Sequence, residues 1–78
     1  MFVYILESEI VLGHYYVGVT EDVIERLKRH NAGEVKHSSK FRPWKIKNYI
    51  WFESDEKAYE FEKYLKSGSG RAFSKKHF

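Results

Sequence analysis

The absence of cysteine from a chain of only 78 residues limits most strongly how this protein can fold. Disulfides and thiolate metal sites are excluded, so one hydrophobic core must hold the fold, and a core of this size is marginal unless it is well packed. Aromatic residues make up 18% of the sequence, and each of them buries a large area. We therefore expect a single domain over residues 1–78, built around an aromatic core.

Charge divides the chain into four blocks that the net charge of +3 conceals. Residues 1–25 carry five acids and no Lys or Arg, and residues 26–47 carry eight bases against one acid. Residues 48–62 carry five acids against one base, and residues 63–78 carry five bases and no acid. The two basic blocks favour a polyanionic partner, although a solvated surface is the commoner explanation of a charge run.

The apolar run at residues 2–6 is too short to span a membrane, and no basic segment precedes it as in a signal peptide. The lack of cysteine also fits a reducing compartment. We expect a cytoplasmic protein without a membrane partner.

Three segments have the pattern of β-strands. Residues 2–6 form a short apolar run, and residues 14–20 form a second strand after a predicted turn at residues 7–13, which indicates a hairpin. Residues 46–52 are predicted to form a third strand, in which even positions (Ile46, Asn48, Ile50, Phe52) and odd positions (Lys47, Tyr49, Trp51) offer apolar side chains to both faces. Gly18 inside the second strand marks a bulge or a place where another group approaches the backbone closely.

Local capping signals predict the helices. Asp22 followed by Glu25 forms a capping box at the start of a first helix, which Asn31-Ala32-Gly33 ends. Residues 34–45 are expected to form a basic loop. Ser54 or Asp55 caps a second helix that extends to about Lys66.

Ser67-Gly68-Ser69-Gly70 is predicted to break the second helix, and residues 71–78 are predicted to form a short helix or tail. The resulting order β-β-α-β-α-(α) predicts an α+β domain in which helices cover a three-stranded antiparallel sheet.

Glu62 and Arg26 are candidates for a phosphate chemistry. Glu62 lies about 40° from Ala58 on a helical wheel, at the edge of the apolar stripe. An edge carboxylate is most often ion-paired or solvated, but it can also hold one Mg²⁺ whose other ligands are waters and phosphate oxygens. Arg26 either pairs with Asp22 on its own helix or stabilises charge on phosphorus, for which a guanidinium is well suited.

Three further side chains offer acid–base or positioning roles, each with a structural alternative. His30 shares a helix face with Arg26 and can either interact with the helix dipole or hold a nucleophile or phosphate. Tyr4 and Tyr16 pack as strand aromatics or act in proton transfer, for which a phenol needs activation.

Basic residues mixed with aromatics suit contact with a nucleic-acid backbone. Phe41 and Trp44 can stack on bases or belong to the core. The candidate nucleic-acid-binding residues are Gly18, Lys28, Arg29, Lys36, His37, Lys40, Arg42, Lys66 and Arg71.

Five segments follow one another in an order that resembles one known family. They are Phe2-Val3-Tyr4, Tyr16-Val17-Gly18, residues 18–33 with Arg26 and His30, Phe41-Arg42-Pro43-Trp44, and residues 58–73 with Glu62. The sequence is similar to the GIY-YIG endonucleases, and looks most like their small standalone bacterial members. The resemblance covers nearly the whole chain, and the order of the motifs makes it specific.

This resemblance implies a metal-dependent endonuclease that hydrolyses phosphodiester bonds in DNA, with RNA as an alternative substrate, acting in repair or recombination on particular DNA structures. Glu62 would be the sole protein ligand of one Mg²⁺ or Mn²⁺ ion, and Arg26 would stabilise the pentacovalent phosphate. Tyr16 or Tyr4 would activate the attacking water, with His30 assisting, and the choice between the tyrosines stays open.

The sequence departs from the family pattern at two places. Val19 and Thr20 stand where many members carry a Lys. Many members also carry an Asn late in the domain, and here no Asn follows Glu62. Either the phosphate is positioned more loosely, or Lys66 and Arg71 take over this role. A nucleic-acid-binding module with weak or no cleavage, and a protein-interaction domain, are the competing hypotheses.

Overall fold

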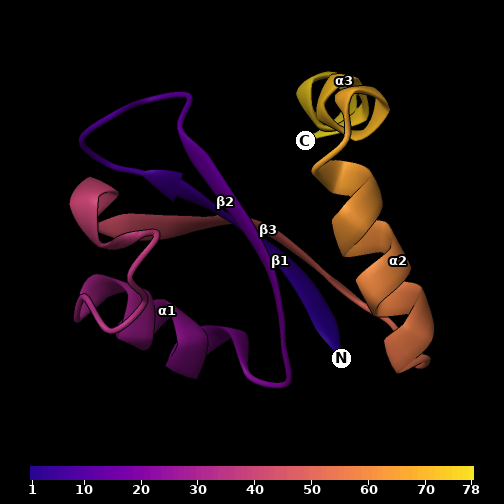
Figure 1. Cartoon of the computed structure of the whole chain (residues 1–78), viewed down its shortest axis with the longest axis horizontal. Helices are drawn as coiled ribbons and strands as arrows, with labels where there is room; N and C mark the ends of the chain where they lie inside the picture. Colours follow the sequence, from indigo (N-terminus) through magenta and orange to yellow (C-terminus); the bar gives the residue numbers. More distant parts are fainter.

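The strands form one antiparallel sheet with β1 at its centre. The computed structural model describes all residues, 1–78. The strands are β1 (Phe2–Ser8), β2 (Tyr15–Thr20) and β3 (Trp44–Trp51), in the spatial order β2-β1-β3 (Figure 1). The predicted hairpin of the first two strands and the predicted α+β class are both confirmed.

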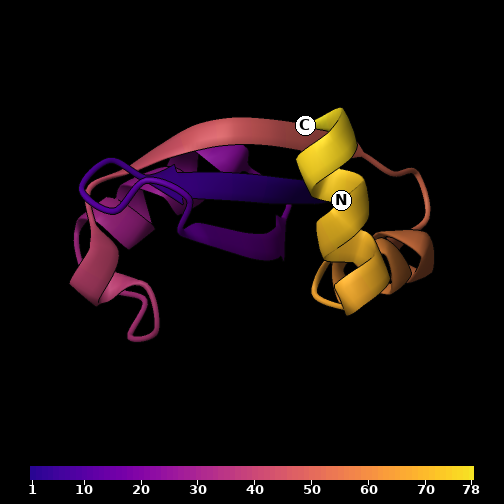
Figure 2. The same cartoon turned by 90° about the horizontal axis from the view of Figure 1, so that it is seen from above.

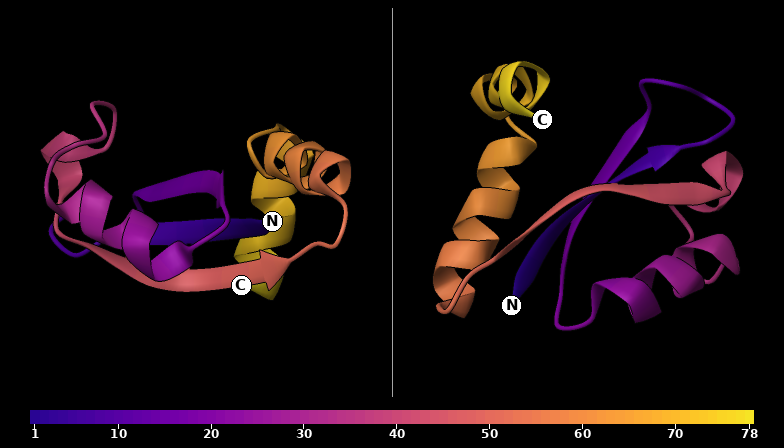
Figure 3. Two further views of the ribbon diagram at one scale, coloured as in Figure 1. Left: turned by 90° about the horizontal axis from the view of Figure 1, so that it is seen from below. Right: turned by 180° about the vertical axis from the view of Figure 1, so that it is seen from behind.

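Helices lie on both faces of this sheet. Helix α1 (Val23–Asn31) covers one face, and α2 (Asp55–Leu65) covers the other, while α3 (Gly68–His77) crosses the end of α2 (Figures 1 and 2). A short 3₁₀ helix, η1 (Ser39–Phe41), lies between α1 and β3. The views from below and from behind show the same division (Figure 3). No helix is long and apolar enough to cross a membrane.

The central strand β1 supplies both halves of the core, because successive side chains of a strand point to opposite faces. Val3 and Ile5 face α2, where they pack with Ala58 and Leu65. Tyr4 and Leu6 face α1, where they pack with Val23 and Trp44. A strand buried on both faces reads as a continuous apolar run, which explains why residues 2–6 were recognisable from sequence.

The regular alternation predicted for the third strand is wrong at its start. The β1–β3 register shifts between Ile5 and Leu6, so that one extra residue of β3 is left over there. As a result Ile46 packs on the α1 side of the sheet and Phe52 on the α2 side, although even spacing predicted one face for both. The strand also begins earlier than predicted, at Trp44.

Two other predicted boundaries need correction. Strand β1 continues to Ser8, because Glu7 and Ser8 still pair with β3 and the predicted turn begins after them. Ser67-Gly68-Ser69-Gly70 ends α2 but also starts α3, since the Ser67 hydroxyl accepts a hydrogen bond from the Gly70 amide at 3.1 Å. A Cβ on Gly70 would collide with the Tyr64 carbonyl, so glycine is required where α3 turns against the end of α2.

The first two helix caps agree with the sequence prediction. The Asp22 carboxylate accepts from the Glu25 amide at 3.0 Å, and Ser54, rather than Asp55, caps α2 by accepting from the Lys57 amide at 3.2 Å. These caps set where α1 and α2 begin, and so which of their residues reach the edge strand β2.

Candidate active site

Tyr4 lies across the edge strand because Gly18 has no side chain. The two residues are partners in the β1–β2 ladder, and the Tyr4 ring and hydroxyl fill the space that a Cβ on Gly18 would need. Since β2 is an edge strand, the phenol reaches the border of the sheet. The group that approaches Gly18 closely is therefore a side chain of the protein itself, and Gly18 is buried beneath it.

Buried polar groups hold the Tyr4 hydroxyl in place. It lies 2.9 Å from His30 Nε2, and His30 Nδ1 lies 2.6 Å from the hydroxyl of Ser38. The Ser38 hydroxyl donates to the Val35 carbonyl at 3.2 Å, so its oxygen is left to accept from Nδ1–H. Nε2 is then unprotonated and accepts a hydrogen bond from the Tyr4 hydroxyl.

Both titratable members of this chain are held in their neutral forms. Burial, with a smaller effect of the Arg26 charge, lowers the pKa of His30 to about 4. Burial also raises the pKa of Tyr4 well above its ordinary value, and negative charge on Tyr16 and Glu62 adds to this effect while Arg26 opposes it. At neutral pH the Tyr4–His30–Ser38 hydrogen-bonded chain is thus uncharged. It supports neighbouring side chains and does not supply a general base.

Arg26 brings the one positive charge into this buried group, without a carboxylate partner. Its Nε atom is buried and has no hydrogen-bond acceptor, and Arg26 takes part in none of the ion pairs. The alternative pairing with Asp22 is not formed, because the Asp22 carboxylate caps the helix instead. A buried donor left unsatisfied in a folded protein calls for an explanation, and a binding role is one.

Glu62 comes to the same border from the opposite face, on α2. Its side chain is 24% exposed, and one oxygen lies 3.3 Å from Lys66 Nζ. The influence of its charge on Tyr4 places the carboxylate within electrostatic range of the phenol. No cluster of three or more His, Cys, Asp or Glu side chains exists that could hold a metal, so a metal bound here would rely on this single carboxylate.

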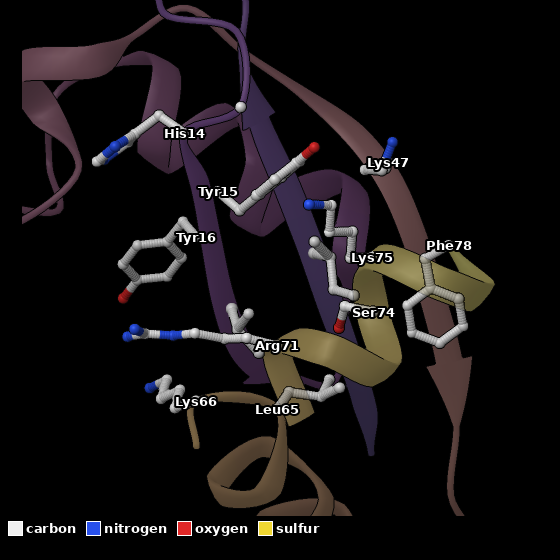
Figure 4. A pocket seen from close by; sticks show the side chains of 13 residues that line it. His14, Tyr15, Tyr16, Lys47, Leu65, Lys66, Arg71, Ser74, Lys75 and Phe78 are labelled. Carbon is white, nitrogen blue, oxygen red and sulfur yellow. The ribbon is translucent and has the colours of Figure 1, made fainter. Parts of the chain in front are cut away.

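Tyr16 is the more accessible of the two candidate tyrosines. Its ring stacks on Tyr4 at 6.3 Å between centroids and meets the edge of His30 at 4.5 Å. It also lines a cleft together with Lys66 and Arg71 (Figure 4). The fold therefore brings Tyr4, Tyr16 and His30 into contact, with Arg26 and Glu62 acting on the same phenol.

The other candidate nucleic-acid-binding residues lie on two separate surfaces. Lys66 and Arg71 line the cleft beside Tyr16. Those of α1 and of the following loop are all solvent-exposed. They are Lys28, Arg29, Lys36, His37, Lys40 and Arg42. Within this set, Arg29 pairs with Glu25 at 2.8 Å and the Arg42 guanidinium packs over Gly33.

Trp44 belongs to the core, so the interpretation that it stacks on bases is wrong. It is 2% exposed, and its Nε1 donates to the Ser38 carbonyl at 2.9 Å. Phe41 is half-buried and stacks on His14 with 3.8 Å between ring centroids.

Ser38 is the residue of the site that sequence reasoning missed. It is fully buried and determines which nitrogen of His30 carries the proton. Nothing in the local pattern of a basic, serine-containing loop distinguishes it from Ser39. The only available signal was its position eight residues after His30. That spacing brings Ser38 to His30 only because the loop folds back onto α1.

Substituting Gly18 with Ala should destabilise the fold by about 1–3 kcal/mol, since the new methyl group would collide with the Tyr4 phenol. Gly68→Ala is the matched control, because nothing lies within 4 Å of a Cβ there, and it should be neutral or slightly stabilising. Urea unfolding of both variants measures the difference. Equal stability would mean that Tyr4 does not lie over Gly18.

Stability should fall as the pH drops through the range in which His30 titrates. The pKa is 6.5 in the unfolded chain and about 4 in the fold, so the unfolded state binds more protons between these values. We expect a loss of up to roughly 3 kcal/mol between pH 6.5 and pH 4. Urea unfolding across this range measures it, with His30→Gln as the control that lacks the titrating group. The same pH dependence in both proteins would contradict a buried neutral His30.

Comparison with known protein families agrees with the geometry. The family model described as the GIY-YIG catalytic domain matches residues 1–76, and the chain belongs to the GIY-YIG family. This is a family of endonucleases that act on DNA, so the family match indicates a nuclease-type domain. Comparisons with curated proteins and with solved structures produced no significant match.

Proposed function

We propose that this protein is a metal-dependent endonuclease that hydrolyses phosphodiester bonds in DNA and acts on particular DNA structures in repair or recombination. The observation that carries the proposal is Arg26, whose guanidinium acts on the Tyr4 phenol, has no carboxylate partner and has a buried Nε without an acceptor. An uncompensated, preorganised positive charge at the border of the sheet suits the charge that develops on a phosphate during cleavage.

Glu62 is the residue that would hold the metal, as Mg²⁺ or Mn²⁺. A single half-buried carboxylate fits a hard cation that keeps most of its waters and takes further oxygens from the substrate phosphate. Bound there, the metal would polarise the phosphate and lower the pKa of a coordinated water. The neighbouring Lys66 already touches one Glu62 oxygen, so the ammonium would have to move aside or share the carboxylate.

The two tyrosines receive different roles. Tyr16 is half-buried and lines the cleft, so it is the phenol placed to contact the attacking water or the substrate. Tyr4 is 1% exposed and donates a hydrogen bond to His30, so it acts as a positioning residue. Tyr4, His30 and Ser38 then hold the Tyr16 ring and the Arg26 guanidinium in their orientation without changing charge at neutral pH.

The test is cleavage of supercoiled plasmid and of branched, nicked and blunt DNA in Mg²⁺, in Mn²⁺ and in chelator, with an RNA of matching sequence as a further substrate. We expect metal-dependent nicking, with the branched DNA cut faster than the blunt duplex. Cleavage that persists in chelator would overturn the proposal. So would cleavage that remains after every purification control and is unchanged in the Arg26→Ala and Glu62→Gln variants.

A binding module without cleavage is the second candidate, favoured by the exposed bases of α1 and the loop after it. It predicts salt-dependent binding of DNA, whose log–log slope reports the number of phosphate contacts, and no product in any metal. A metal titration that reports an ion at Glu62 would count against it.

A further inference from the structure

A cleft of about 920 Å³ lies on the α3 side of the sheet, next to Tyr16. Strands β1, β2 and β3 provide one wall, and the end of α2 with α3 provides the other. Figure 4 shows that Arg71 extends from α3 in the direction of the Tyr16 hydroxyl, with Lys66 beside it. The cleft therefore runs from α3 to Tyr16, which is the candidate site residue that lines it.

The side chains that line this cleft include four cations and no carboxylate. Lys47, Lys66, Arg71 and Lys75 line it, and none of the 13 lining residues is acidic. Only Lys66 among these four has an ion-pair partner. Arg71 and Lys75 are four residues apart on α3 and so share the face that looks into the cleft. Three unpaired cations around one concave surface favour an anionic occupant with repeated charges.

The hydrophobic part of the lining favours an unpaired strand over a duplex. Six of the 13 residues are hydrophobic, and the four that keep exposed surface are Tyr15, Tyr16, Val17 and Phe78. The exterior of a duplex is mainly sugar and phosphate, and its base faces are stacked inside. Unpaired bases expose their faces, and base faces pack well on apolar and aromatic side chains while the cations follow the backbone.

We propose that this cleft binds an unpaired nucleic-acid strand and delivers it to Tyr16. This deepens the proposed nuclease function and rests on it for the fate of the strand, because a strand in the cleft passes beside Tyr16 and the Glu62–Lys66 pair. The preferred substrate is accordingly a single strand, or a branched molecule that offers a single-stranded arm.

The experiment compares Lys75→Glu with Lys76→Glu, which make the same charge change at adjacent exposed positions of α3, one lining the cleft and the other outside it. Fluorescence anisotropy in chelator measures binding of an oligothymidine about 12 nucleotides long, of a blunt duplex of equal length, and of an abasic strand. Circular dichroism verifies that both variants fold.

Lys75→Glu should weaken binding of the oligothymidine about tenfold and make its salt dependence shallower, whereas Lys76→Glu should change it less than about twofold. The wild type should bind the abasic strand about tenfold more weakly than the oligothymidine, because the apolar lining loses its partners. Equal effects of the two variants, equal binding of the abasic strand, or an equal loss for the duplex would each overturn the inference.

These measurements separate the cleft from the nuclease. If the binding results hold and no metal supports cleavage, then the cleft is supported and the proposed nuclease function fails. If the wild type cleaves DNA but Lys75→Glu binds and cleaves as Lys76→Glu does, then the cleft is wrong and the nuclease stands.

Discussion

Arg26→Ala is expected to lower the rate of DNA cleavage by about a hundred- to a thousandfold, the usual loss when one preorganised donor to a developing negative charge is removed. Its stability should not fall with its activity. The buried Nε has no acceptor in the fold, and a buried donor without an acceptor costs stability. Removing the side chain removes that cost. A variant that is inactive yet as stable as the wild type, or more stable, is the signature of a residue held in place for function.

The matched control is Arg29→Ala, which removes the same side chain type one turn later on α1. Arg29 is exposed and pairs with Glu25, so its loss should lower the cleavage rate only by the few-fold effect of one exposed DNA contact and the stability by at most a few tenths of a kcal/mol. Single-turnover cleavage rates and urea unfolding of both variants supply the comparison. Arg26→Lys should restore only part of the rate, because an ammonium keeps the charge but not the two-pronged geometry.

Two outcomes would contradict this view of Arg26. Equal losses of activity in Arg26→Ala and Arg29→Ala would point to a general effect of positive charge on DNA binding. A large loss of stability in Arg26→Ala would make Arg26 a structural residue, and its effect on cleavage would then carry no information about the reaction.

Glu62→Gln should lower metal-dependent cleavage by at least about a thousandfold, since a metal ion at the scissile phosphate supplies several kcal/mol. The substitution keeps the shape of the side chain and removes its charge, and the half-buried position leaves little room for another carboxylate to take over. The second readout is a Mn²⁺ titration in the absence of DNA. It should report one site in the wild type and none in Glu62→Gln.

Glu60→Gln is the control for Glu62, because both lie on α2 and both pair with a lysine of that helix. The Glu60 side chain is 59% exposed, so its amide variant should retain both the cleavage rate and the Mn²⁺ site. Retention of the Mn²⁺ site in Glu62→Gln would show that another group binds the metal. Loss of the site together with normal cleavage would remove the metal from the reaction.

Local signals were sufficient to predict most of the secondary structure. A helix cap involves residues three apart, and the carboxylate of Asp22 and the hydroxyl of Ser54 accept from the amides that such spacing predicts. The register shift opposite Ile5 and Leu6 had no comparable signal. It depends on how two strands more than forty residues apart align, and it decides that Ile46 and Phe52 face different halves of the core.

The candidate site likewise has a part that the sequence predicted and a part that it did not. The order of Tyr4, Tyr16, Arg26, His30 and Glu62 was readable as a motif, and the family match over residues 1–76 agrees with it. The sequence did not show that the two tyrosines differ in burial, because both are aromatic residues within apolar strand segments. Burial separates them, since Tyr4 is enclosed by Gly18 and His30 while Tyr16 lines the cleft.

By itself, the sequence determined the fold class, the starts of the first two helices and the membership of the family, because these depend on spacing along the chain. Only the tertiary structure decided that Ser38 orients His30, that Arg26 is buried without an acceptor, and that four cations surround one cleft. These properties belong to groups from different elements. Desolvation and hydrogen-bond partners arise only when packing brings those elements together, so no pattern in one segment can encode them.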